Sequence, residues 1–188
     1  MKIKAVLLTA VMAVAMVGQA ADYNWTANPG ASWFGYVNAF ELDGTTFATG
    51  FAEATFPTAS ANWSGTTLTM SPNTRLYDEP ILDAFWVDQG TLAANKVVEF
   101  NYYQESTAAV GETLQFDFAA IANNLPAGYE ARAFVKVLDG FASWATTQYD
   151  WVDLTALPSG PLGLTVASPG AGSPFIQAGF SVKGIAVS

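Results

Sequence analysis

The sequence contains neither cysteine nor histidine. Without cysteine there can be no disulfide, thiol nucleophile or cysteine-ligated metal, so the fold must be stabilised by its packed core. Without histidine the Ser-His-Asp triad, histidine-ligated zinc and histidine acid–base catalysis are also excluded. Composition alone therefore removes many classes of enzyme and metalloprotein.

Basic residues are scarce, with seven Lys and Arg against 16 Asp and Glu. Two of the seven, Lys2 and Lys4, precede an apolar run over 5–17 that leads to the small residues Gly18 and Ala20. The run is shorter than the ~20 residues that span a bilayer, so the pattern predicts a secretory signal peptide over 1–20. The mature chain keeps five basic residues against 16 acidic ones, a net charge of −11. That charge argues against a nucleic-acid partner.

Residues 21–188 have the length of one ordinary domain. They contain no later apolar run long enough to span a membrane. We therefore expect a secreted, extracellular or cell-surface protein, or a periplasmic one. Of the whole chain, 51% is hydrophobic and only 12% charged, which indicates an exterior built largely from Thr, Ser, Asn, Gln and Gly.

Strict alternation marks two segments near the C-terminus, 130–139 and 175–183. This period is typical of strands with two chemically different faces. In the first segment the residues expected to face a packed interior are Ala131, Ala133, Val135 and Val137. The residues expected to face water or a ligand are Arg132, Phe134 and Lys136.

Such patterns predict about nine short strands separated by Gly, Pro and Asn turns, and no convincing amphipathic helix. They are expected over 32–41, 46–56, 68–70, 96–103, 112–119, 130–139, 149–154, 163–166 and 175–187. Residues 22–30 are expected to be rich in turns, 58–95 irregular, and 83–88 a strand or a helical turn. The prediction is an all-β fold, an antiparallel β-sandwich of jelly-roll type.

The order of features over 96–187 carries a resemblance to a known type of protein. Glu99-Phe-Asn-Tyr-Tyr103 is followed by Gly111-Glu-Thr-Leu-Gln-Phe116, Ala133-Phe-Val-Lys-Val137, a Trp-bearing loop and Gln177-Ala-Gly-Phe180. In this order the chain resembles secreted jelly-roll modules of the galactose-binding-like and carbohydrate-binding-module type. The resemblance implies a β-sandwich, often with a sugar site on a sheet face or loop rim and sometimes a structural calcium ion. It does not imply catalysis.

A sugar-binding face needs aromatic planes to stack on a pyranose ring and polar groups to bond its hydroxyls. Tyr103 and Trp144 are the candidates for stacking. The candidates for hydrogen bonding are Asn101, Gln115, Arg132 and Gln177. The simpler interpretation is that the polar residues are solvated outward side chains and the tryptophans fill the core or loops.

Carboxylate pairs are the remaining route to catalysis, because glycoside hydrolysis needs two acids and no histidine. The available pairs are Asp78 with Glu79, Asp83 with Asp88, and Asp150 with Asp153. Their spacing does not fix two carboxyls across a cleft, so we expect a binding protein rather than an enzyme.

No cofactor is expected either, since no loop has the Asp-x-Asp-x-Asp-Gly pattern of calcium sites. The competing hypothesis is a structural subunit of an extracellular matrix, filament or surface layer, whose partners are copies of itself joined through strand edges.

Overall fold

The computed structural model describes residues 21–52, 60–71 and 84–186. The expected signal peptide over 1–20 lies outside these residues. The described chain folds into a six-stranded sheet, a three-stranded sheet and a two-stranded hairpin. No helix in these ranges is long and apolar enough to cross a membrane.

The six-stranded sheet consists, in spatial order, of β3 (Phe47–Ala52), β2 (Phe34–Phe40), β6 (Val97–Thr107), β11 (Ser173–Ile185), β8 (Glu130–Gly140) and β9 (Thr146–Asp153). The three-stranded sheet consists of β1 (Tyr23–Thr26), β7 (Thr113–Asp117) and β10 (Leu162–Thr165). The hairpin is formed by β4 (Ser60–Ser64) and β5 (Thr67–Ser71). A short 3-10 turn, η2 (Leu154–Ala156), follows β9.

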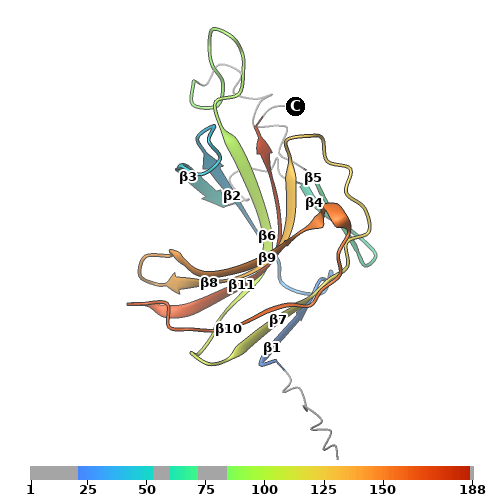
Figure 1. Cartoon of the computed structure of the whole chain (residues 1–188), viewed down its shortest axis with the longest axis vertical. Coiled ribbons are helices and arrows are strands. Elements are labelled where there is room, and N and C mark those ends of the chain that lie inside the picture. Colours follow the sequence, from blue (N-terminus) through green and yellow to red (C-terminus); the bar gives the residue numbers. More distant parts are fainter. Residues whose placement is uncertain (1–20, 53–59, 72–83, 187–188) are drawn as a thin grey trace, which may run out of the picture.

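Strand β11 organises the large sheet, because it lies at its centre and pairs antiparallel with both β6 and β8. Figure 1 shows the sheet bending along its length, with β2 and β3 on its upper part and β8 and β9 on its lower left. The three-stranded sheet lies below the bend and the β4–β5 hairpin lies to its right. The second layer of the sandwich is therefore made of two separate pieces.

Two hydrophobic clusters hold these pieces to the same side of the large sheet. Beneath the three-stranded sheet, Leu114 and Phe116 of β7 pack with alternate residues of β8 and β11. Those partners include Ala133, Val135, Val137, Ile176 and Ala178. The aliphatic row predicted for 130–139 is therefore confirmed as an interior row.

The second cluster lies under the hairpin, where Ala61 and Met70 pack against buried residues of β2 and β6. It also contains Trp86, which is 5% exposed. Val98 and Phe100, at alternate positions of β6, also face this cluster. Period-two patterning thus predicted the inner face of each long strand.

The predicted all-β sandwich is confirmed, but it has eleven strands in the described residues rather than nine. The two unpredicted strands are β1, which lies in the segment expected to be rich in turns, and β4, which lies in the segment expected to be irregular. Strand β1 pairs parallel with β7, so the sandwich is not entirely antiparallel. In the segment 83–88, residues 84–86 form a turn and Val87 bridges to Ala94.

Candidate functional site

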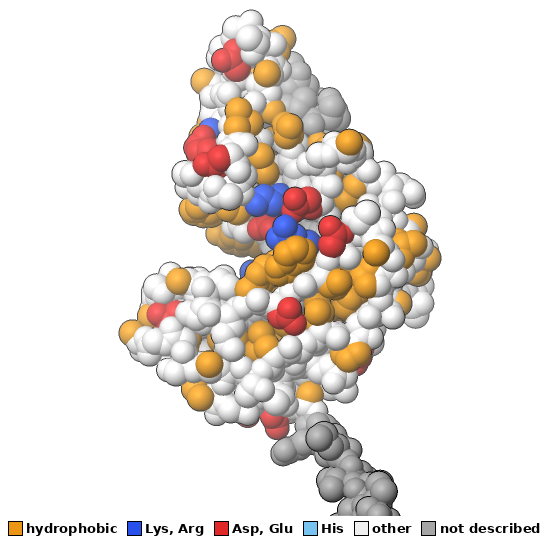
Figure 2. All heavy atoms as spheres, viewed as in Figure 1, with side chains coloured by type: hydrophobic (Ala, Val, Ile, Leu, Met, Phe, Trp, Pro, Cys, Tyr) orange, Lys and Arg blue, Asp and Glu red, His pale blue; other side chains and the backbone are white. Residues whose placement is uncertain are grey.

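The side of the six-stranded sheet opposite both hydrophobic clusters is hollow. Figure 2 shows the hollow at the left of the molecule, between its upper and lower parts, with Lys, Arg, Asp and Glu side chains gathered beside it. We call this surface the hollow face. It is built by every second residue of β2, β6, β11, β8 and β9. Its members are Phe34, Tyr36, Asn38, Glu99, Asn101, Tyr103, Glu105, Glu130, Arg132, Phe134, Lys136, Tyr149, Trp151, Asp153, Gln177, Ser181 and Lys183.

Strand pairing sets these residues side by side in rows across the sheet. One row is Trp151, Phe134, Gly179, Tyr103 and Phe34. The row beside it is Asp153, Arg132, Ser181, Asn101 and Tyr36. The row on the other side of the first one is Tyr149, Lys136, Gln177 and Glu105. An aromatic row is therefore flanked by two polar ones.

Gly179 lies in the aromatic row, at a point where β6 and β11 approach each other closely. A Cβ at this position would lie 2.6 Å from the Cα of Tyr103 and 2.8 Å from its Cβ. Only glycine lets β6 and β11 approach so closely here. Tyr103 is thereby buried to 8% exposure, and this burial, with the Glu105 carboxylate, raises the pKa of its phenol to about 12. The hydroxyl stays protonated and can donate a hydrogen bond.

Two buried amides lie beside the aromatic row. The Gln177 side-chain nitrogen donates to Glu105 at 3.0 Å, and Gln177 is 6% exposed. Asn101, 5% exposed, donates to Glu99 at 3.3 Å. Asn38 donates to the same Glu99 oxygen at 3.1 Å. These contacts fix the amides and carboxylates in place, and each group has more than one hydrogen-bonding position.

Strand β8 supplies two cations to the hollow face. Arg132 donates to Glu130 at 2.7 Å, and its guanidinium lies 3.9 Å from the ring centre of Trp151. The Lys136 ammonium lies 4.9 Å from the ring centre of Phe134 and 5.7 Å from that of Tyr103. Burial lowers the pKa of Lys136 to about 8, and the nearby carboxylates Glu99 and Glu105 oppose this shift.

The hollow face brings together four of the six candidate binding residues: Asn101, Tyr103, Arg132 and Gln177. Gln115 is separate, because β7 belongs to the other sheet, and its amide donates to Asp117 at 3.1 Å. The expectation that Phe134 is accessible was wrong. It is on the predicted face but only 1% exposed, because Lys136, Tyr149 and their neighbours pack over it.

Trp144, the sixth candidate, lies in the β8–β9 loop at the border of the hollow face. Its ring is half exposed and packs edge-on against Phe175 at 5.3 Å and Phe141 at 5.2 Å. Phe175 precedes Gln177 by two residues in β11 and so shares its face. Asp139 holds the loop, since its carboxylate accepts from the Gly172 amide at 2.6 Å and the Ser143 hydroxyl at 2.9 Å.

Sequence reasoning missed the contribution of β2 to this face, although the pattern was present. Tyr36 and Asn38 alternate with the buried Val37 and Ala39. The same alternation that identified 130–139 would have placed them outward. What sequence could not supply was the pairing of β2 with β6.

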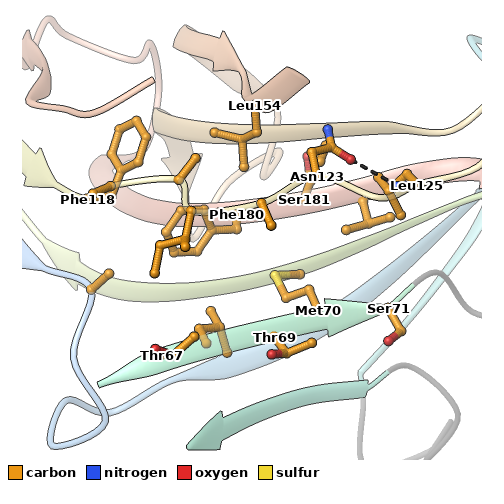
Figure 3. Close-up of a pocket in the computed structure, with 18 of the residues that line it drawn as sticks. Thr67, Thr69, Met70, Ser71, Phe118, Asn123, Leu125, Leu154, Phe180 and Ser181 are labelled. Atoms are coloured by element: carbon orange, nitrogen blue, oxygen red, sulfur yellow. Dashed lines mark hydrogen bonds between the residues drawn. The ribbon is translucent and has the colours of Figure 1, made fainter. Parts of the chain in front are cut away.

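A second hollow of about 880 Å³ opens on the inner side of the sheet, in the gap between the two pieces of the second layer. Figure 3 shows Phe180 in this cavity, with Met70 and Thr67 of the hairpin on one side and Leu154 on the other. Residues 117–126 form another wall, in which the Leu125 amide donates to the Asn123 side chain at 3.1 Å. Among the described residues that line it, Asp117 is the single charged one.

The candidate catalytic pair Asp150 and Asp153 is divided between the two faces of β9, because the two residues are three positions apart in a strand. Asp153 accepts from the Thr155 amide and caps η2. Asp78, Glu79 and Asp83 lie outside the described residues. Within the described ranges no group of three or more Asp and Glu residues is arranged to hold a metal ion.

Comparison with known proteins gives similarity to solved structures alone. No protein-family model matches the chain, and no curated protein matches it. A solved structure described as "CBM4 structure and function" is similar to it, with a TM-score of 0.36 and 15% sequence identity. The similarity covers 83% of this chain and 84% of the other.

Proposed function

We propose that the chain is a non-catalytic carbohydrate-binding module that holds a glycan on the hollow face. The observation that carries the proposal is the position of Tyr103 between Asn101 and Gln177. These residues lie on two adjacent strands, with register partners at Gly179 and Ser181. Rings flanked by fixed amides match the two surfaces of a pyranose, whose C–H face is apolar and whose rim carries hydroxyls.

The polar groups suit sugar hydroxyls because each hydroxyl both donates and accepts a hydrogen bond. Glu99 and Glu105 supply acceptors, while Asn101 and Gln177 supply both kinds of group. Their mutual hydrogen bonds hold these side chains before a ligand arrives. Such preorganisation reduces the entropy lost on binding.

The aromatic surface available to a sugar lies on the edge strand β9, in the rows that also contain the buried Tyr103 and Gln177. Trp151 and Tyr149 are each 42% exposed, and both lie on the hollow face. Two exposed rings at alternate positions of one strand form a contiguous apolar patch, and such patches can mark interaction sites. In the proposal they contact the C–H face of the glycan.

A binding rather than catalytic role is proposed for two reasons. The one described candidate pair of carboxylates, Asp150 and Asp153, is split between faces of β9. On the hollow face the Glu130 carboxylate already bonds Arg132, and Glu99 and Glu105 bond amides. We further propose secretion, from the N-terminal pattern. Mass spectrometry of protein exported by cells should give a chain that begins at Ala21.

The test of the proposed function is affinity electrophoresis of the chain from Ala21 against soluble neutral and acidic polysaccharides, followed by calorimetry on any that bind. Gln177→Ala should weaken binding about tenfold, since it removes one polar contact and frees Glu105. Gln115→Ala is the matched control, because it removes the same amide from the other sheet, and it should leave binding unchanged.

Equal loss in the Gln115 and Gln177 variants would move the site away from the hollow face. Light scattering on the same samples tests the competing structural role. Large assemblies that bind no polysaccharide would overturn the proposal in favour of a subunit that associates with itself.

A further inference from the structure

The basic side chains of this acidic protein are unevenly distributed. Four of its seven lie in the described residues, and three of these four are on the hollow face: Arg132, Lys136 and Lys183. The fourth, Lys96, is bonded to Glu41 at 3.0 Å. In a chain with more than twice as many acidic as basic residues, this gathering sets the hollow face apart.

Two of the three hollow-face cations are already held by the protein. Arg132 bonds Glu130, and Lys183 donates to the carbonyl of Gly44 at 2.6 Å while lying 4.4 Å from the ring centre of Phe40. Lys136 is different. Within the described residues its ammonium has neither a hydrogen-bond acceptor nor a carboxylate within ion-pair distance.

The groups around Lys136 explain why it stays unpaired. Tyr149 lies beside it on β9, and Gln177 lies beside it on β11. On β6, Glu105 is bonded to Gln177 and Glu99 to two asparagines, so both nearby carboxylates are directed to other donors. Arg132, the remaining charged neighbour on β8, carries the same sign as Lys136. Aromatic rings complete the surroundings and supply no acceptor of comparable strength.

The Lys136 ammonium is partly buried and has no carboxylate of the described residues within ion-pair distance. The cost of its lost hydration exceeds the attraction of Glu99 and Glu105, and this cost is the physical cause of the lowered pKa of Lys136. An acceptor that carries a full negative charge would offset it best, because charge-assisted hydrogen bonds are about twice as strong as neutral ones. A neutral hydroxyl would satisfy a donor but leave the charge uncompensated.

We propose that the glycan bound on the hollow face is acidic, and that Lys136 binds its anionic group, a carboxylate or a sulfate ester. This inference rests on the proposed function and names the class of its ligand. The Lys136 ammonium lies over the buried rings of Phe134 and Tyr103, and the amides of Gln177 and Asn101 bond the neighbouring hydroxyls. Lys136 therefore selects acidic over neutral sugars.

The experiment compares polysaccharides that share a backbone and differ in charge. Polygalacturonate is paired with its methyl ester, and dextran sulfate with dextran, so that the two arms separate carboxylate from sulfate recognition. Calorimetry is run at pH 7 in about 0.15 M salt, where the Debye length is about 8 Å and long-range repulsion is screened. Wild-type protein should bind one acidic member about 10- to 100-fold more tightly than its neutral counterpart.

Two variants assign this preference to a residue. Lys136→Met keeps the length of the side chain and should abolish the preference for the acidic member. Lys96→Met makes the same change in net charge away from the hollow face and should retain it. Circular dichroism melting checks that both variants fold.

The outcomes separate the two proposals. Equal affinity of the wild type for charged and neutral partners overturns the inference and leaves carbohydrate binding standing. A preference for the acidic member that survives in Lys136→Met likewise overturns the inference and leaves carbohydrate binding standing. Failure to bind any glycan of either kind overturns carbohydrate binding itself, and the inference with it.

Discussion

Strand β11 borders two hollows of opposite character. On its inner side, Phe180 and Val182 line a cavity of about 880 Å³, and the described part of its wall contains one charged residue. On its outer side, Gln177 and Ser181 are buried among amides, carboxylates and rings. The cavity has a defined volume, yet the hollow face has the chemistry that polar ligands require. Size alone therefore does not identify the site.

The two sides also differ in how their polar atoms are satisfied. Beside the cavity, the indole N–H of Trp63 is buried and is the one such side-chain atom in the described residues without a hydrogen-bond partner. On the hollow face the buried amides are bonded in place. The inner side is organised for packing and the outer side for oriented polar contacts, and this contrast can be tested by substitution.

The largest expected effect is on the inner side. Phe116 is completely buried beneath the three-stranded sheet, so Phe116→Ala should lower the free energy of unfolding by about 3–5 kcal/mol. Glycan affinity of the molecules that remain folded should stay within about twofold of wild type. Urea unfolding and calorimetry measure the two quantities. A large loss of affinity in folded protein would show that the two sides are coupled.

A smaller change in the free energy of unfolding, of opposite sign, is expected from substitution of Lys136. Because burial lowers the pKa of Lys136 to about 8 from 10.5, the charged form is disfavoured in the folded state. Lys136→Met should therefore stabilise the protein at pH 7, by at most about 3 kcal/mol before the loss of the ring contacts is subtracted.

The sign of its pH dependence follows from proton binding. Below pH 8 the lysine is protonated in both states, and the cost of its burial is present in full. Between pH 8 and 10.5 the unfolded chain keeps the proton that the folded chain has lost, so wild-type stability rises and the advantage of Lys136→Met shrinks. Urea unfolding at pH 7, 8, 9 and 10 checks this. A variant that is less stable than wild type at pH 7 would give Lys136 a structural role instead.

At Asn101 stability and binding should both change modestly. Asn101→Ala removes a buried donor to Glu99, which keeps its bond from Asn38, so the cost should be about 1–2 kcal/mol. Glycan affinity should fall about tenfold. Asn62→Ala, an exposed asparagine on the hairpin, is the control and should change neither quantity measurably. Equal effects of the two substitutions would remove Asn101 from the site.

The sequence predicted this division of faces wherever a strand is long and half of it is buried. In β8 and β11 the alternation of aliphatic with polar or aromatic residues identified the inner row correctly, since a pleated strand has a period of two. It could not distinguish Gln115 from Gln177. Both are outward glutamines on alternating strands, and only the pairing of β7 with β1 and β10 puts Gln115 on the other sheet.

Short strands whose partners lie far away in the chain could not be predicted from the sequence either. The four residues of β1 contain no alternation long enough to read, and their partner β7 is about 90 residues further along the chain. Likewise, nothing in the composition of 139–148 shows that the loop holds Phe141 and Trp144 with φ near +60°. The loop is also tied to a distant segment, since the Gly172 amide donates to the Asp139 carboxylate.

The smallest expected change in stability is at this loop. Trp144 has φ +57°, where a residue other than glycine is strained by roughly 1–2 kcal/mol. Trp144→Gly should relieve the strain while losing the ring contacts with Phe141 and Phe175, so the net change should lie within about 1 kcal/mol. Leu157→Gly, at φ +52° and also about half exposed, is the matched control.

Glycan binding by these two variants defines how far the site extends. If a long oligosaccharide follows β11 past Gln177, Trp144→Gly should weaken its binding several-fold and leave a short one unaffected, because only the long chain reaches Phe175 and the loop. Leu157→Gly should weaken neither. Equal binding of long and short chains by Trp144→Gly would confine the site to the rows around Tyr103, and the exposed ring of Trp144 would then belong to another contact.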